Sequence, residues 1–137
     1  MDNDKLNLNA MPTLNLAFIG DGVFDLLVRE HLVRSSSAHV GELNKAKVAL
    51  VNCRSQAQSA EAILPHLSEE EAAVFRRGRN AKVNSASKHS DLADYHAATG
   101  LETLFGCLYL RGEDDRIKEL FSLIINHFDS HGEEPQP

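Results

Sequence analysis

The 137-residue sequence has no tryptophan and only two cysteines, Cys53 and Cys107. The cysteines lie far apart, and neither has a second cysteine or a histidine at metal-ligand spacing. The sequence therefore shows neither a disulfide framework nor a zinc site, and we expect both thiols to be reduced and to lie in the core. Long apolar runs are also absent, because no window approaches the roughly 20 apolar residues needed to cross a bilayer.

The opening segment, MDNDKLNLNA, lacks the basic and apolar regions of a signal peptide. We therefore expect a cytoplasmic protein with no membrane partner. The length is typical of one domain, and the 42% apolar content is enough for one core. The predicted organisation is an N-terminal lead over residues 1–12, a folded domain over 13–128 and a disordered tail over 129–137.

Strand signals are nearly absent, since the sequence contains no sustained alternation of apolar and polar residues. Apolar residues recur instead at helical spacing, so the sequence predicts an all-α fold. Pro65 ends the second predicted helix, and Ser68 followed by three glutamates predicts a capping box at the start of the third. The predicted helices span about residues 13–34, 41–63, 68–78, 91–111 and 113–128, with a polar loop before the fourth.

Two acids stand in strongly apolar segments and are each flanked by glycines. Asp21 lies between Gly20 and Gly22, and Glu102 lies between Gly100 and Gly106. A glycine inside a helix costs about 1 kcal/mol relative to alanine unless close backbone packing requires it. The pattern therefore predicts two helices that cross closely, each contributing one carboxylate.

A buried carboxylate needs a cation, a hydrogen-bond donor or a proton. One divalent metal would satisfy both acids, and Mg²⁺ suits oxygen ligands and binds through one or two protein carboxylates. The residues leave open the alternative that each acid meets an arginine or lies in water at a helix rim. Asp25, one helical turn after Asp21, is likewise either a second acid near the site or a surface residue.

Positive charge is concentrated in one segment of this acidic chain. The formal net charge is −6, yet residues 72–90 contain no acid and five of the 14 bases. Arginine matches a phosphate in bidentate fashion, so we expect a phosphate-binding edge, with Gly78 and Asn80 favouring a turn whose backbone amides contribute. A solvated loop with bases complementing a helix dipole is the alternative. The five bases are Arg76, Arg77, Arg79, Lys82 and Lys88.

No aromatic residue interleaves these bases, so a nucleic-acid target would be a duplex or a backbone and not a stacked single strand. Three segments, AFIGDGVFDLLVREHL, RRGRNAK and YHAATGLETLFGCLYL, then resemble the signature segments of the Mini-ribonuclease III family, short bacterial and plastid relatives of ribonuclease III. The likeness extends over about residues 14–125, in the family's order and spacing.

The resemblance implies a helical bundle like the ribonuclease III endonuclease domain, with 13–128 as the catalytic domain. It implies a homodimer that uses Mg²⁺ to hydrolyse double-stranded RNA, leaving 5′-phosphate and 3′-hydroxyl ends, in the maturation of 23S ribosomal RNA. Ribosomal proteins or pre-ribosomal particles are further partners that it suggests. It gives no place for the dimer seam, for which the two apolar predicted helices, 13–34 and 91–111, are the candidates.

The motif aspartate and glutamate of the family fall on Asp21 and Glu102, which the resemblance makes catalytic residues and ligands of one Mg²⁺. Larger relatives have two further carboxylates, at positions that hold Ala17 and Thr99 here. Their absence motivates the alternative of a catalytically inactive module that binds duplex RNA or ribosomal particles. The residues expected to bind RNA are Arg76, Arg77, Arg79, Asn80 and Lys82.

Overall fold

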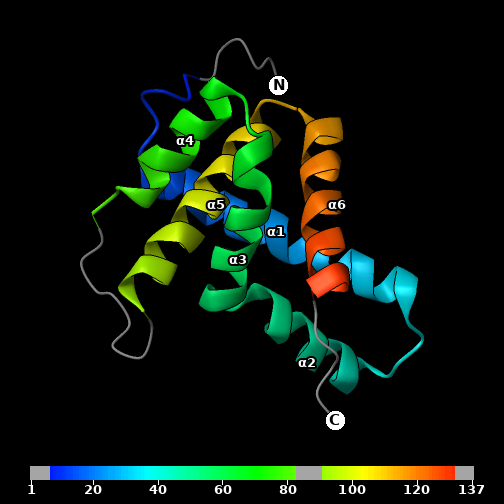
Figure 1. Ribbon diagram of the computed structural model, residues 1–137. Helices are drawn as coiled ribbons and strands as arrows, with labels where there is room; N and C mark the ends of the chain where they lie inside the picture. Colours follow the sequence, from blue (N-terminus) through cyan, green and yellow to red (C-terminus); the bar gives the residue numbers. More distant parts are fainter. Residues whose placement is uncertain (1–6, 83–90, 132–137) are drawn as a thin grey trace.

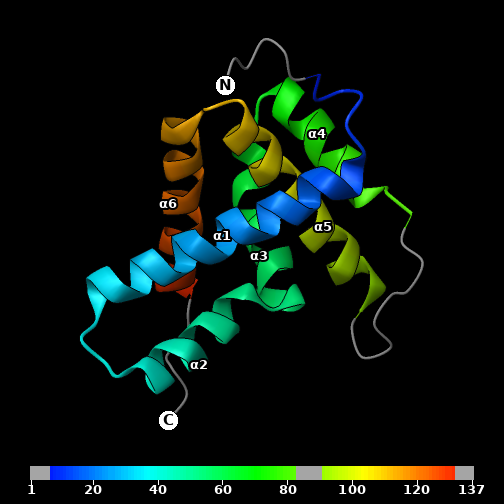
Figure 2. The same ribbon diagram turned by 180° about the vertical axis from the view of Figure 1, so that it is seen from behind.

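The computed structural model describes residues 7–82 and 91–131. All regular elements in these two ranges are helical, which confirms the predicted all-α class. Figures 1 and 2 show their arrangement from opposite sides. The elements are α1 (Thr13–Ser35), α2 (Val40–Val51), α3 (Cys53–Ile63), the short 3-10 helix η2 (Leu64–His66), α4 (Glu69–Arg79), α5 (Leu92–Leu110) and α6 (Asp114–His131).

Helix α5 lies at the centre of the bundle, with α1, α3, α4 and α6 packed around it (Figures 1 and 2). Most of its residues from Ala98 to Leu108 are buried. Phe24 of α1 meets Phe105 of α5 and Phe121 of α6 edge to face, with ring centroids 5.7 and 5.9 Å apart. Such aromatic contacts stabilise a core beyond simple area burial, so they fix α1 and α6 against the rest of the bundle.

The second predicted helix is in fact two helices. The chain is extended at Asn52, with ψ of 164°, and this residue ends α2 and begins α3. The Asn52 side chain accepts a hydrogen bond from the backbone N–H of Ser55 and donates to the carbonyl of Val48. A short polar side chain that caps the next helix competes with continuation of the previous one. The prediction of one helix over 41–63 was therefore wrong at this point.

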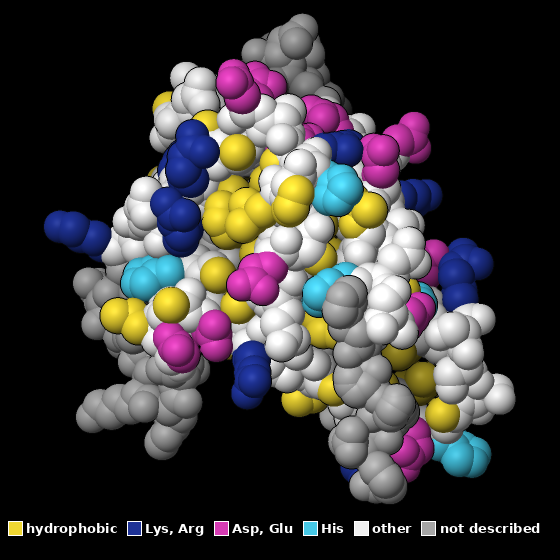
Figure 3. Space-filling view, viewed as in Figure 1, with side chains coloured by type: hydrophobic (Ala, Val, Ile, Leu, Met, Phe, Trp, Pro, Cys, Tyr) yellow, Lys and Arg dark blue, Asp and Glu magenta, His cyan; other side chains and the backbone are white. Residues whose placement is uncertain are grey.

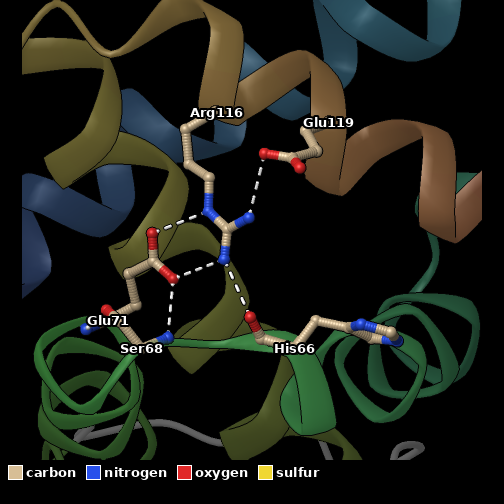
Figure 4. Close-up of polar contacts among 5 residues, drawn as sticks. All are labelled: His66, Ser68, Glu71, Arg116 and Glu119. Carbon is tan, nitrogen blue, oxygen red and sulfur yellow. Dashed lines mark hydrogen bonds and ion pairs between the residues drawn. The ribbon is translucent and has the colours of Figure 1, made fainter.

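The capping box predicted at Ser68 is present and is tied to α6. The Ser68 hydroxyl and the Glu71 carboxylate each accept a hydrogen bond from the other residue's backbone N–H. Two nitrogens of Arg116 donate to the same carboxylate at 2.8 Å each (Figure 4). Arg116 also donates to the His66 carbonyl and to Glu119. The start of α4 is thus fastened to α6 by one guanidinium group.

The segment before α1 is packed on the bundle. Leu8 is buried and packs with Leu16 and Cys107 in a small apolar cluster. Arg77 of α4 donates to the Leu8 carbonyl at 3.0 Å, to the Thr13 hydroxyl at 2.8 Å and to the Met11 carbonyl. The described part of the N-terminal lead therefore belongs to the folded unit.

At the other end, α6 continues to His131, three residues past the predicted boundary. The rest of the predicted tail, 132–137, lies outside the described residues, as do Lys88 and residues 83–90 of the predicted loop. None of the helices in the described ranges is long and apolar enough to span a membrane.

Candidate active site

The helices that carry the two predicted acids cross in close contact. A Cβ atom built on Gly20 of α1 would lie 1.7 Å from the carbonyl oxygen of Glu102, and one built on Gly106 of α5 would lie 2.0 Å from the carbonyl oxygen of Leu16. No side chain fits at either point, so glycine lets the two backbones touch. The predicted close crossing of these helices is confirmed.

The other glycines serve different purposes. A Cβ on Gly22 would meet nothing within 4 Å, whereas one on Gly100 would lie 2.8 Å from the Phe75 ring of α4. Gly78 lies inside α4 and does not form a turn, because a Cβ there would lie 2.3 Å from the Thr103 hydroxyl. The prediction of a turn at Gly78 was therefore wrong: its small size serves helix packing, and α4 continues to Arg79.

The crossing brings the side chains of Asp21 and Glu102 into hydrogen-bonding contact. Asp21 is exposed and Glu102 is half-buried behind it. Burial of Glu102, and then the charge and hydrogen bond of Asp21, raise the pKa of Glu102 to about 8. Two adjacent carboxylates cannot both ionise without cost, so without a cation the pair holds a proton near neutral pH.

Within residues 7–82 and 91–131, none of the ion pairs involves either acid. The alternative that each acid meets an arginine thus finds no support there. Asp21 does reach water, as the helix-rim alternative expects, but Glu102 does not lie at an open rim. The described ranges also contain no group of three or more histidine, cysteine or acidic side chains arranged to hold a metal ion.

The donor set of the pair fits Mg²⁺. Both groups offer carboxylate oxygens, the ligands that a hard divalent cation prefers, and one or two protein carboxylates are usual for this ion. A dication would also offset burial and the negative charge of Asp21, the two largest causes of the raised pKa of Glu102. Asp21 and Glu102 are the residues that would hold it.

Exposed cations gather at the C-terminal end of α4. Arg76, Arg79 and Lys82 are exposed, and Asn80 caps the helix with its backbone N–H bonded to the carbonyl of Arg76 at 2.9 Å. Figure 3 shows Lys and Arg side chains together over this helix. Arg77 differs, because it is half-buried and its guanidinium is bonded to the N-terminal segment. Arg77 thus has a structural role, whereas the other three cations are exposed to solvent.

Comparison with known proteins assigns the chain to a protein family. Residues 14–113 match the ribonuclease III domain model. The Mini-ribonuclease 3 of Clostridium tetani is 38% identical over 126 residues, covering 91% of this chain and 83% of that protein. The Mini-ribonuclease 3 of a Thermoanaerobacter species is 41% identical over 121 residues, covering 88% of this chain and 85% of that protein. The chain belongs to the Mini-ribonuclease 3 family.

A solved structure agrees with this assignment. The crystal structure of a Fusobacterium nucleatum protein matches with a TM-score of 0.78 and 27% identity, covering 86% of this chain and 94% of that one. The chain is accordingly an endoribonuclease of the ribonuclease III superfamily, with that superfamily's all-α endonuclease domain.

Positions where larger ribonuclease III relatives have further acids are packed into this Mini-ribonuclease 3 fold. Ala17 is 7% exposed and Thr99 is 6% exposed. The Thr99 hydroxyl donates to the carbonyl of Tyr95 within its own helix. Asp25 adds no carboxylate to the pair either, because it is bound to Arg29 at 2.6 Å and to Lys47 of α2 at 3.6 Å. Of the two interpretations of Asp25, the structure supports the surface residue.

One residue near the pair was missed by sequence analysis. Gln56 of α3 is 3% exposed, and its side chain hydrogen bonds the carboxylate of Glu102. The available signal was its spacing, since Gln56 precedes the buried Ala60 and Ile63 by four and seven residues. A polar residue on the apolar face of a helix needs a partner, which the sequence alone does not identify.

The cysteines divide between core and surface. Cys107 is buried, as predicted, but Cys53 is half-buried and lines a hollow of about 710 Å³ between α3 and the start of α5. The prediction that both lie in the core was wrong for Cys53, because the break at Asn52 places it in the first, partly exposed turn of α3.

Proposed function

We propose that this endoribonuclease cleaves double-stranded RNA at a Mg²⁺ site formed by Asp21 and Glu102, leaving 5′-phosphate and 3′-hydroxyl ends. The observation that carries the proposal is the contact between these two carboxylates at a crossing of glycines. Bound Mg²⁺ would supply an activated water and charge stabilisation at the phosphate. The protein's part is to hold the two carboxylates together, with exposed Asp21 toward the substrate.

The exposed side chains at the end of α4 are proposed to hold the RNA backbone. Arg76, Arg79 and Lys82 supply charge, and Asn80 supplies a neutral amide beside them. Contacts to phosphates position a duplex without reading its sequence, while 2′-hydroxyls in the wide minor groove distinguish RNA from DNA. Arg77 supports this surface indirectly, by anchoring α4 to the N-terminal segment.

The natural substrate is proposed to be a ribosomal RNA precursor, with cleavage contributing to 23S ribosomal RNA maturation in the cytoplasm. The family resemblance supports this proposal. Ribosomal proteins or the pre-ribosomal particle would present the duplex.

A homodimer is proposed to form through α1. Helix α5 is largely enclosed by its neighbours, whereas α1 exposes apolar side chains on the face away from the core. Leu14, Phe18 and Leu26 are 44%, 84% and 65% exposed, and Gly22 completes their four-residue spacing. A two-fold axis through such a stripe would give each strand of an antiparallel duplex its own active site.

Cleavage of an end-labelled RNA duplex, with Mg²⁺ or with EDTA, tests the chemistry. We expect Asp21→Asn and Glu102→Gln to lower the rate by about 10³-fold or more, since losing several kcal/mol of transition-state stabilisation has that effect. Asp25→Asn is the matched control, one turn along the same helix, and should cleave normally. Equal losses in all three variants would contradict the assigned site.

The missing acids at Ala17 and Thr99 motivated the alternative of an inactive module, which membership of an endoribonuclease family does not favour. That hypothesis requires the wild-type protein to bind duplex RNA, with affinity falling steeply as salt rises, and to cut nothing in Mg²⁺. Binding without cleavage would support it and remove the proposed Mg²⁺-dependent cleavage of double-stranded RNA. The absence of any salt-dependent binding would remove both.

Phe18→Glu tests the dimer surface by light scattering after gel filtration. The control is Val40→Glu on α2, where the wild-type side chain is similarly exposed at 80%. We expect Phe18→Glu to yield monomers and Val40→Glu to leave the dimer intact. A wild-type protein that is monomeric at micromolar concentration would contradict the proposal.

A further inference from the structure

Most buried polar side chains in the described part of the chain have structural partners. Three hydroxyls donate to the carbonyl four residues earlier in their own helix, and the Glu71 carboxylate pairs with Arg116. Gln56 differs, because its side chain bonds the carboxylate of Glu102, one of the two candidate metal ligands. The five buried polar residues are Gln56, Ser59, Glu71, Thr99 and Thr103.

Gln56 is held firmly where α3 begins. Its backbone N–H bonds the carbonyl of Asn52 at 2.9 Å, and the Asn52 side chain caps the helix through the N–H of Ser55. The Ser55 hydroxyl also reaches back to the carbonyl of Ala49 in α2 at 2.6 Å. At 3% exposure, the Gln56 side chain has little room for another rotamer. The break between α2 and α3 thus presents one fixed amide to Glu102.

The neutrality of this amide decides what it can do. A lysine or arginine here would neutralise Glu102 and compete with a metal ion for its oxygens. An amide N–H instead favours the ionised carboxylate, opposing the effect of burial, while leaving the negative charge in place. It can therefore orient a metal ligand without displacing the metal.

We propose that Gln56 is a positioning residue, whose amide N–H holds the Glu102 carboxylate in the orientation that faces Asp21 and thereby sets the affinity of the pair for a divalent cation. The inference rests on the proposed function, since it concerns the same site. Groups that hydrogen bond a metal ligand from behind typically change metal affinity by about 10- to 100-fold when they are removed.

Direct Mn²⁺ binding to the full chain without RNA tests the inference, with free Mn²⁺ followed by electron paramagnetic resonance. Gln56→Met keeps the length of the side chain and removes the donor, so we expect the dissociation constant to rise by about 10-fold or more. The matched control is Gln58→Met, two residues along the same helix at a half-exposed position, which should bind as the wild type does.

A second measurement separates positioning from general damage. The Mg²⁺ concentration that half-saturates RNA cleavage should rise in Gln56→Met by the same factor as the Mn²⁺ dissociation constant, and excess Mg²⁺ should restore the rate. Duplex binding in EDTA should not change. Should Gln56→Met fail to fold, Gln56→Asn replaces it, because the shorter amide does not reach the carboxylate.

The possible outcomes distinguish the two proposals. Wild-type affinity for Mn²⁺ in a folded Gln56 variant, or an equal loss in Gln58→Met, overturns the role of Gln56 and leaves the proposed function standing. If the wild type and Asp21→Asn bind Mn²⁺ equally, the metal site itself is wrong, and both proposals fall.

Discussion

Two glutamates of this molecule, the buried Glu71 and the half-buried Glu102, have opposite surroundings. Glu71 accepts two hydrogen bonds from Arg116, and mainly for that reason its pKa is lowered. Glu102 faces another carboxylate, and burial together with Asp21 raises its pKa to about 8. The same side chain fastens two helices in one place and remains without a described cationic partner in the other. An acid held in a costly environment is the stronger candidate for chemistry.

Gly20→Ala would disrupt the surroundings of Glu102 and should have the largest effect on stability. The new methyl group would overlap the carbonyl oxygen of Glu102, which must move. We expect a loss of about 3 kcal/mol or more of unfolding free energy, and a cleavage rate at least about 100-fold lower in the folded fraction, because a displacement of about 1 Å at a site has such a cost. Urea unfolding and RNA cleavage measure the two effects.

Gly22→Ala is the control for the stability measurement, since a Cβ there would meet nothing within 4 Å in the single chain. It should raise the stability of the monomer by up to about 1 kcal/mol through helix propensity. If the two variants behaved alike, the close crossing of α1 and α5 would not hold the site together.

Arg116→Met would make Glu71 resemble Glu102, by leaving an acid without its cation. We expect a loss of about 2–3 kcal/mol at pH 7, somewhat less than for a fully buried pair because the Arg116 side chain is 23% exposed. Glu119→Gln, which removes an exposed partner, should cost no more than about 0.5 kcal/mol. Cleavage per folded molecule should be normal in both variants.

The stability difference between Arg116→Met and the wild type should depend on pH. The lowered pKa of Glu71 contributes stability that is present above its ordinary pKa and is lost as the pH falls through the folded value. The variant should therefore approach the wild type in stability under acid conditions. An equal difference at pH 7 and at pH 2 would show that lost packing, and not charge, explains the effect.

Glu102→Gln should change stability less than Gly20→Ala or Arg116→Met, and it should stabilise the protein. The pKa of Glu102 is raised from 4.5 to about 8, so the stability of the wild type is fully present below the lower value and is lost as the pH rises through the higher one. An amide stays neutral throughout. In EDTA at pH 9 we expect a gain of about 2 kcal/mol in thermal or urea unfolding.

At pH 4 the two proteins should be equally stable, because Glu102 is then neutral in both the folded and the unfolded chain. A gain at pH 4 as large as that at pH 9 would contradict the raised pKa of Glu102, which burial and the charge of Asp21 produce. A loss at pH 9 would mean that the hydrogen bond from Gln56 outweighs burial and the charge of Asp21.

Local features of the fold were predictable from short stretches of sequence. The capping box at Ser68 and the end of the helix before Pro65 depend on neighbours within a few residues, and so does helical periodicity. The break at Asn52 was also local, but a capping asparagine within a continuous helical pattern is easily taken for a surface residue.

The sequence by itself determined where the two acids and the permissive glycines stand, and that α5 is apolar enough to be central. Only the tertiary structure decided their partners. Residues 21 and 102 meet because Gly20 and Gly106 let α1 and α5 touch. Gly78 and Gly100 are also glycines within helices, but they let α4 pack closely against α5. Likewise Arg77 turns toward the N-terminal segment, while Arg76 and Arg79 face water. Periodicity records which face of a helix is buried, but a partner is chosen by packing between distant segments.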